Sequence, residues 1–326
     1  MSFRKCIDDG VAAGELSSEK ADEIKNLFGD LEVQYNKQMG FAAASSKAAI
    51  DTSAAIKKIS KEKKRRAMLQ AKTWTKIRMH MDTFKTATGV QNKYKATADI
   101  FEQSVTSKFN SVAQVQAAIR SRATAKMDTF LGTFKRNIVG ETRNKAQLKN
   151  VIREVFKPGS TDDVAARQMA EAWGQAAEYL RKRFNSAGGA IPNRKDWGMP
   201  QFHNAIAIAA AGFTSWRDSI LPKLDVGKMI DEQTGLPFST QKLELVLNDV
   251  FETIRTNGQN KSKPGKFAGN QSFASRHQDH RFLVFKDADN WMKYQEEFGN
   301  PNAFDVMMAH IDNMSRDIAL MEVMGP

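Results

Sequence analysis

The sequence predicts a mainly α-helical protein: a long N-terminal helical arm or bundle, followed by a compact, mostly helical domain with little β-structure. All eight prolines lie at or after Pro158, so no proline interrupts a helix in the first 157 residues. Apolar residues in that region recur at steps of three and four. From Gly140 onward the helical patterns are shorter and are separated by Gly, Pro and capping residues. We therefore expect two domains, residues 1–139 and residues 140–326.

The N-terminal domain is predicted to contain three helices. The first begins at Ser18, with acidic residues in its first turns, and ends near Met39. The second runs from Phe41 to about Thr88 and would be roughly 70 Å long at 1.5 Å per residue. The third is expected over residues 96–137 as one continuous helix with one apolar face.

The apolar face of the third helix is long and narrow for an ordinary compact domain. Such a face is typical of a helix that packs against copies of itself. A helical subdomain packed within its own chain explains the pattern equally well, and both interpretations stay open. The first predicts a homo-oligomer interface made by Phe101, Val105, Phe109, Ile119, Met127, Phe130 and Phe134.

The C-terminal domain is predicted to hold shorter helices and one strand, residues 281–285. Four of the five tryptophans and an almost balanced charge indicate a self-contained core that folds alone. Helices are expected over residues 142–156, 161–187, 240–257, 288–298 and 301–324, with a further short buried helix after Pro200.

Positive charge is concentrated in one part of the chain. The formal net charge is +12, and residues 41–140 hold 20 basic and 6 acidic residues. The densest run, Lys57–Arg66, has seven basic residues opposed by Glu62 alone. Like charges at this spacing repel one another on an isolated helix, so an anionic partner would stabilise the run. The candidate nucleic-acid-binding residues are therefore Lys57, Lys58, Lys61, Lys63, Lys64, Arg65 and Arg66.

Nucleic acid is the first partner to consider for this run. Phosphate backbones neutralise lysine and arginine without sequence specificity, through counterion release. An acidic protein surface and an anionic membrane are the next candidates. A solvated helix face with no partner is the remaining interpretation.

No motif in the sequence predicts an enzyme, a cofactor or a metal site. The chain has no Walker loop, no G-x-G-x-x-G, no H-E-x-x-H and no G-x-S-x-G. His277, Asp279 and His280 form a weak cluster, for which ordinary loop histidines are the better explanation. His203 is expected to cap a helix or pack in the core. Cys6 is the one cysteine, which excludes an intramolecular disulfide framework and a cysteine-based zinc site.

Membrane-spanning and secretion signals are also missing from the sequence. No segment of about 20 residues is solidly apolar. The first 15 residues contain charged side chains and no apolar core of a signal peptide.

Five stretches of the C-terminal half resemble a known family. They are GETRNKAQLKNVIREVF (140–156), AEAWGQAAEYLRKRFNSAGGAI (170–191), DWGMPQFHN (196–204), HRFLVFKDADNWMKYQEEFG (280–299) and MSRDIALMEVMGP (314–326). In this order they resemble the internal virion, or ejection, proteins of short-tailed bacteriophages. The resemblance covers residues 140–326 and includes no catalytic motif.

The resemblance implies a structural phage virion protein that is stored inside the head, or at the portal–tail axis, and is ejected to help form a conduit for the genome across the host envelope. Implied partners are copies of itself, other internal virion proteins, the portal or tail, genomic DNA through phosphate contacts, and the host envelope during infection. Members of this family continue well past the equivalent of Pro326, so we expect this chain to be part of a longer protein. Some members carry a peptidoglycan-cleaving domain, but no acid residue here matches one. The alternative function is a sequence-independent nucleic-acid-binding or packaging protein that is not ejected.

Overall fold

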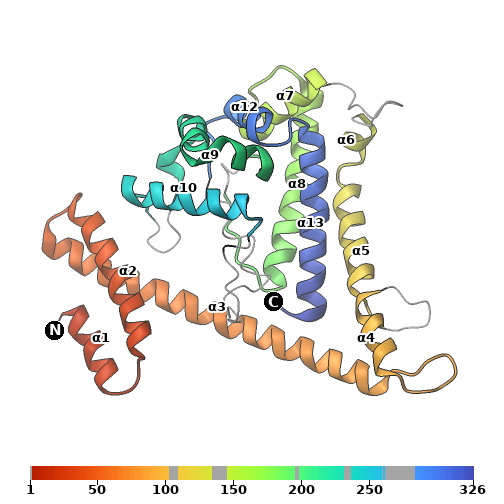
Figure 1. Ribbon diagram of the computed structural model, residues 1–326, viewed down its shortest axis with the longest axis horizontal. Coiled ribbons are helices and arrows are strands. Elements are labelled where there is room, and N and C mark those ends of the chain that lie inside the picture. The colour runs from red at the N-terminus through yellow and green to blue at the C-terminus, as the bar shows by residue number, and fades with distance from the viewer. Residues whose placement is uncertain are drawn as a thin grey trace. The chain divides into compact units, whose positions relative to one another are not determined.

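The computed structural model describes residues 2–102, 109–133, 145–194, 198–230, 236–258, 260 and 283–326. These residues form twelve α-helices and no β-strand, which confirms the mainly α-helical fold class (Figure 1). The chain divides into two compact units. The first comprises residues 1–67 and 227–238, and the second comprises residues 68–226 and 239–326.

The first unit contains α1 (Phe3–Ala12), α2 (Ser18–Asn36) and the beginning of α3 (Phe41–Thr83). The start of α2 at Ser18 and the start of α3 at Phe41 agree with the sequence prediction, whereas α1 was not predicted. The hydroxyl of Ser17 caps α2 by accepting the Lys20 backbone N–H at 3.4 Å. The core of the unit joins α2 to α3 through Phe28, Leu31, Tyr35, Ala44 and Ala48.

The prediction of one continuous helix over residues 96–137 is wrong. Within the described residues this region forms α4 (Lys93–Phe101), α5 (Val112–Ala125) and α6 (Asp128–Thr133). A capping box starts α5: Ser111 Oγ accepts the Gln114 N–H at 3.2 Å, and Gln114 Oε1 accepts the Ser111 N–H at 3.1 Å. The apolar repeat continues across the breaks because separate helices bury the same face in one core.

The second unit is built around α8 (Val164–Ser186) and α13 (Ala303–Met324), which lie side by side with α5 next to α13 (Figure 1). The side chain of Trp173, on α8, is 1% exposed in this core. Asp163 caps α8 by accepting the Ala166 N–H at 2.9 Å. The remaining α-helices are α7 (Lys145–Phe156), α9 (Ala205–Ile220), α10 (Thr240–Arg255) and α12 (Ala288–Phe298).

The boundary between the units differs from the predicted boundary at residues 139–140. The second unit begins at Met68 and includes α4, α5 and α6. Phe130 stacks on Phe304 of α13, with ring centroids 5.9 Å apart and planes 7° from parallel. The change in charge at residue 140 therefore marks a change in surface composition and not a domain boundary.

The predicted strand at residues 281–285 is not present in its described part, residues 283–285. Phe285 forms one isolated antiparallel bridge with Leu224. Asp225 N–H donates to the Val284 carbonyl at 2.8 Å, and Lys286 N–H donates to the Lys223 carbonyl at 3.0 Å. The partner segment follows the short 3₁₀ helix η1 (Leu221–Lys223), and the pairing does not continue into a ladder.

Helix α9 contains a break at Gly212. This residue has φ 76° and ψ 163°, which is not a helical conformation. Glycine adopts such angles without the steric cost that a Cβ atom adds. The break separates the first half of α9, which Asn204 caps, from the second half, which buries Trp216 and Ile220.

Candidate nucleic-acid interface

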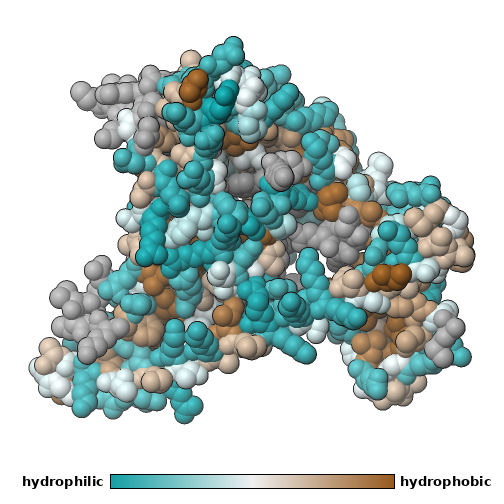
Figure 2. All heavy atoms as spheres, turned by 180° about the vertical axis from the view of Figure 1, so that it is seen from behind, coloured by the Kyte–Doolittle hydropathy of each residue, from teal (hydrophilic) through white to brown (hydrophobic). Residues whose placement is uncertain are grey.

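The basic run lies in the part of α3 that belongs to the first unit. Lysine and arginine are good helix formers, so the run continues the helix despite its charge. Its five lysines are all exposed, and none of them makes an ion pair or a side-chain hydrogen bond within the part of the chain that the structure describes. Hydrophilic side chains cover the middle of α3 in the view from behind (Figure 2). The exposed lysines are Lys57, Lys58, Lys61, Lys63 and Lys64.

The two arginines of the run differ from the lysines because one forms an ion pair and the other is half-buried. Arg65 donates to Glu62 Oε2 from both Nη2, at 2.8 Å, and Nε, at 3.0 Å, and both side chains are about one-third exposed. Arg66 is half-buried, and this burial lowers the pKa of its guanidinium from the usual value. The available charge of the run therefore lies on the lysines, and five of the seven predicted residues keep a free cationic group.

The lysines are distributed unevenly around the helix. Successive residues turn by about 100°, so Lys57, Lys61 and Lys64 share one face and Lys58 lies at its edge. Lys63 lies on the other side of the helix. From Lys57 to Lys64 the helix rises about 10 Å, which places three cationic groups in line along two turns. Such a row suits the closely spaced phosphates of a nucleic-acid strand and has no base-reading pattern.

The predicted oligomer interface is wrong for three of its seven residues. Ile119, Met127 and Phe130 are 0% exposed inside the second unit, where α5 and α6 pack against α8 and α13. Their side chains are therefore not available to a second copy. This burial matches the other interpretation of the apolar face, a subdomain packed within its own chain.

The other four residues of that interface have different positions. Phe101 is 44% exposed. Phe109 is half-buried, and its ring centroid lies 4.4 Å from that of His80. Val105 and Phe134 lie outside the described residues. Whether the protein forms a homo-oligomer through another surface stays a prediction.

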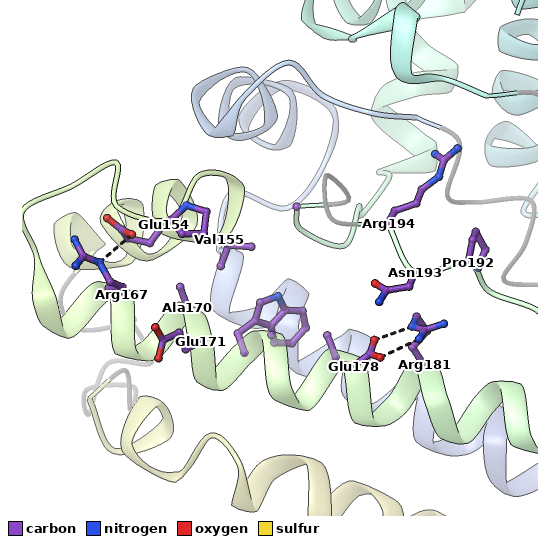
Figure 3. A pocket seen from close by; sticks show the side chains of 15 residues that line it. Glu154, Val155, Arg167, Ala170, Glu171, Glu178, Arg181, Pro192, Asn193 and Arg194 are labelled. Atoms are coloured by element: carbon purple, nitrogen blue, oxygen red, sulfur yellow. Dashed lines mark hydrogen bonds and ion pairs between the residues drawn. The ribbon is translucent and has the colours of Figure 1, made fainter. Parts of the chain in front are cut away.

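A pocket of about 420 Å³ between α7, α8 and the segment after α8 contains several charged residues (Figure 3). The side chain of Glu154 is fully buried and accepts hydrogen bonds from Gly159 N–H at 2.6 Å, Thr161 N–H at 2.7 Å and the Thr161 hydroxyl at 2.6 Å. The hydroxyl bond is the largest effect that lowers the pKa of Glu154, and burial opposes it. Arg167 Nε lies 3.6 Å from the same carboxylate.

The other charged pair in this pocket also has a structural partner. Arg181 donates to both oxygens of Glu178, at 2.7 and 2.9 Å, and to the Ile191 carbonyl at 2.8 Å. The bond to Arg181 is the largest effect that lowers the pKa of Glu178. These two carboxylates hold turns and helix ends together, and the pKa of each is lowered, whereas a general acid needs a raised pKa.

Of the five histidines, His203 lies where the sequence suggested, at the start of a helix. Its Nδ1 lies 2.7 Å from the hydroxyl of Tyr294, which also accepts the Trp216 Nε1–H at 3.2 Å. Burial raises the pKa of Tyr294 far above the usual tyrosine value, and the bond from Trp216 opposes this rise. His203 thus belongs to a core hydrogen-bond network. The cluster of His277, Asp279 and His280 lies outside the described residues.

The described residues contain no group of three or more His, Cys, Asp or Glu side chains that could hold a metal ion. No helix among them is long and apolar enough to cross a bilayer.

Comparison of the chain with protein-family models, with curated proteins and with solved structures finds no match.

Proposed function

We propose that this protein is a non-enzymatic structural protein that binds nucleic acid without sequence specificity through the exposed lysines of α3. The observation that carries the proposal is the row Lys57, Lys61 and Lys64, which is exposed and has no ion-pair partner among the described residues. Unpaired cations at this density release counterions from a phosphate backbone when they bind it.

We further propose that the protein acts in a phage particle, as an internal virion protein that is ejected to help form a conduit for the genome. The support for this setting is the resemblance of residues 140–326 to ejection proteins. Mass spectrometry of purified virions, before and after genome release, tests it. The protein should be found in filled particles and be lost from emptied ones. A packaging protein that is not ejected would stay in the emptied particles, and a protein missing from both would refute the phage setting.

The binding site is tested with the triple variant Lys57→Gln/Lys61→Gln/Lys64→Gln. Each contacted phosphate contributes about −0.9 to the slope of log affinity against log salt on duplex DNA, so the slope should become shallower by up to about 2.7. The affinity of the variant for DNA should fall by about the same factor whatever the sequence of the DNA. Arg65 and Arg66 are left unchanged because they are partly buried within the chain.

A matched control removes the same charge elsewhere. Lys149→Gln/Lys157→Gln/Lys293→Gln replaces three exposed lysines of the second unit. This control should keep the slope of the wild-type protein. An unchanged slope in the α3 variant would refute the DNA contact. If that variant also failed to assemble into particles, its lysines would instead face an acidic protein surface.

A further inference from the structure

A second cationic site lies in the second unit, in a cleft of about 650 Å³. Its walls come from the end of α3 and the turn that follows it, from the start of α5 with the residues just before it, and from the end of α13. A cleft of this volume falls within the usual range for small-molecule sites. The lining residues are Lys76, Met79, His80, Thr83, Phe84, Lys85, Phe109, Asn110, Val115, Glu322 and Val323.

The end of α3 presents one face to this cleft. Lys76, Met79, His80 and Thr83 follow the spacing i, i+3, i+4, i+7, which places them on one side of a helix. Lys76 is exposed and has no ion-pair partner in the described part of the chain. Its ammonium group is therefore available to an anion in the cleft.

The second cation, Lys85, is held by an ordered turn. Lys85 forms an antiparallel bridge with Gln91, and Thr86 N–H donates to the Val90 carbonyl at 2.9 Å. The turn is closed at Gly89, whose φ of 79° favours glycine. Lys85 is exposed and, like Lys76, has no ion-pair partner among the residues that the structure describes. The ordered turn thus holds the backbone of Lys85 at the cleft, and its exposed ammonium group is available to the same anion.

The lining of the cleft also contains an imidazole and aromatic rings. His80 Nε2 lies 3.1 Å from Asp99 Oδ2 but is not aligned for a hydrogen bond, and these side chains are 11% and 3% exposed. The His80 ring packs against Phe109 at 4.4 Å and against Phe84 at 5.4 Å. These contacts fix the imidazole and leave a lining that is apolar and aromatic beside the two cations.

The acidic residue that lines the cleft is already paired. Both oxygens of Glu322 accept hydrogen bonds from Arg183, at 2.8 and 2.9 Å. Its charge is therefore largely compensated, and the two lysines give the cleft a positive character. This combination fits an anion that carries an apolar, flat group.

We propose that this cleft binds a phosphate monoester joined to a nucleoside, with the phosphate between Lys76 and Lys85 and the base against Met79, Phe84 and Phe109. Inorganic phosphate would leave the aromatic wall unused, whereas a nucleoside without phosphate would leave both lysines without an anion. A free nucleotide and the 5′-phosphorylated end of a nucleic-acid strand share this chemistry. The site does not include Lys57, Lys61 or Lys64, the lysines of the proposed DNA contact.

Isothermal titration calorimetry of the full chain with adenosine 5′-monophosphate tests the proposal. We expect saturable binding of one nucleotide, weakened about tenfold by Lys76→Gln/Lys85→Gln because two charge-assisted contacts are lost. The matched control Lys72→Gln/Lys93→Gln removes two exposed lysines from α3 and α4 that do not line the cleft, and it should bind as the wild-type protein does. Adenosine should bind at least about tenfold more weakly than the nucleotide.

The sources of the phosphate are separated by a short oligonucleotide with and without a 5′-phosphate. In the α3 triple variant, tighter binding of the phosphorylated strand than of both the unphosphorylated strand and the free nucleotide would identify strand ends as the ligand. The α3 triple variant should bind the nucleotide normally, so failure of the DNA proposal leaves this one standing. The proposal would be overturned if the nucleotide showed no saturable binding, or if Lys76→Gln/Lys85→Gln and Lys72→Gln/Lys93→Gln bound it equally. Inorganic phosphate that bound as tightly as the nucleotide would also overturn it.

Discussion

Replacement of Glu154 with glutamine tests how much one buried carboxylate stabilises the second unit. Glutamine has nearly the same shape, so the variant changes charge and hydrogen bonding with little change in packing. Its amide can keep the acceptor oxygen toward Thr161 but then places an N–H₂ group against the Gly159 N–H, where Glu154 accepts at 2.6 Å. Two donors would face each other where the buried side chain of residue 154 meets the turn.

The cost follows from the bonds that are lost. Hydrogen bonds to a charged group contribute roughly 1.5–3 kcal/mol each, and a buried donor without a partner costs about 1–3 kcal/mol. One lost bond and one unpaired N–H predict a decrease of about 2.5–6 kcal/mol in the free energy of unfolding. Glu171→Gln is the matched control, because Glu171 is exposed on α8, and it should change stability by less than about 0.5 kcal/mol.

The effect should depend on pH in one direction. The folded state lowers the pKa of Glu154 below its ordinary value of 4.5, so the folded protein binds fewer protons here than the unfolded chain. The stabilisation is therefore present above pH 4.5 and is lost as the pH falls through the folded pKa. The difference in the free energy of unfolding between the wild-type protein and Glu154→Gln should become smaller over the same pH range.

Urea unfolding, followed by tryptophan fluorescence at pH 7 and at pH 4, measures both effects. Trp173 is buried in the same unit and reports its unfolding. A Glu154→Gln variant as stable as the Glu171→Gln control at pH 7 would refute the reasoning. A difference in the free energy of unfolding between wild type and Glu154→Gln that grows as the pH falls would also refute the reasoning.

Three further predictions concern the core of the second unit. Ile119→Ala should lower the free energy of unfolding by about 2–5 kcal/mol because it leaves a cavity, whereas Ile206→Ala, at 84% exposure, should change it by less than about 0.5 kcal/mol in the same urea titration. Tyr294→Phe should cost about 1–3 kcal/mol, measured by thermal unfolding, because the buried Trp216 N–H loses its acceptor. A fragment of residues 140–326 should bind a hydrophobic dye and unfold without cooperativity, since it lacks α5 and α6; a sharp thermal transition would contradict this.

Helix starts were the part of the fold that sequence patterns predicted best. A cap joins residues three positions apart, so its signal is local. Asp287 accepts the Asn290 N–H at 2.8 Å and starts α12 as predicted. Asp163 accepts the Ala166 N–H at 2.9 Å and starts α8 at Val164, three residues after the predicted start at residue 161. The end of α3 was placed five residues too late because Gly89 belongs to a turn and does not end the helix.

Features that depend on distant segments could not be predicted. The apolar repeat indicated burial correctly for Ile119, Met127 and Phe130, but the pattern is the same whether the covering surface is a second copy or α13 of the same chain. The basic run could be recognised in the sequence. The ion pair between Arg65 and Glu62 depends on the rotamers of both side chains, which no sequence pattern encodes. The cleft proposed to bind a nucleotide joins residues from both ends of the second unit, and no local spacing relates Lys76 to Val323.

The break in α9 has a consequence for how freely the sequence can vary. A Cβ atom at Gly212 would have no neighbour within 4 Å, so packing leaves room there for a larger residue. Its φ of 76° nevertheless disfavours every other amino acid. In a library of all single substitutions, position 212 should therefore reject most replacements while the exposed Ala209 and Ala210 accept many. In a mutational scan, Gly212 would therefore look like a residue that binds a ligand, although its constraint comes entirely from its backbone dihedral angles.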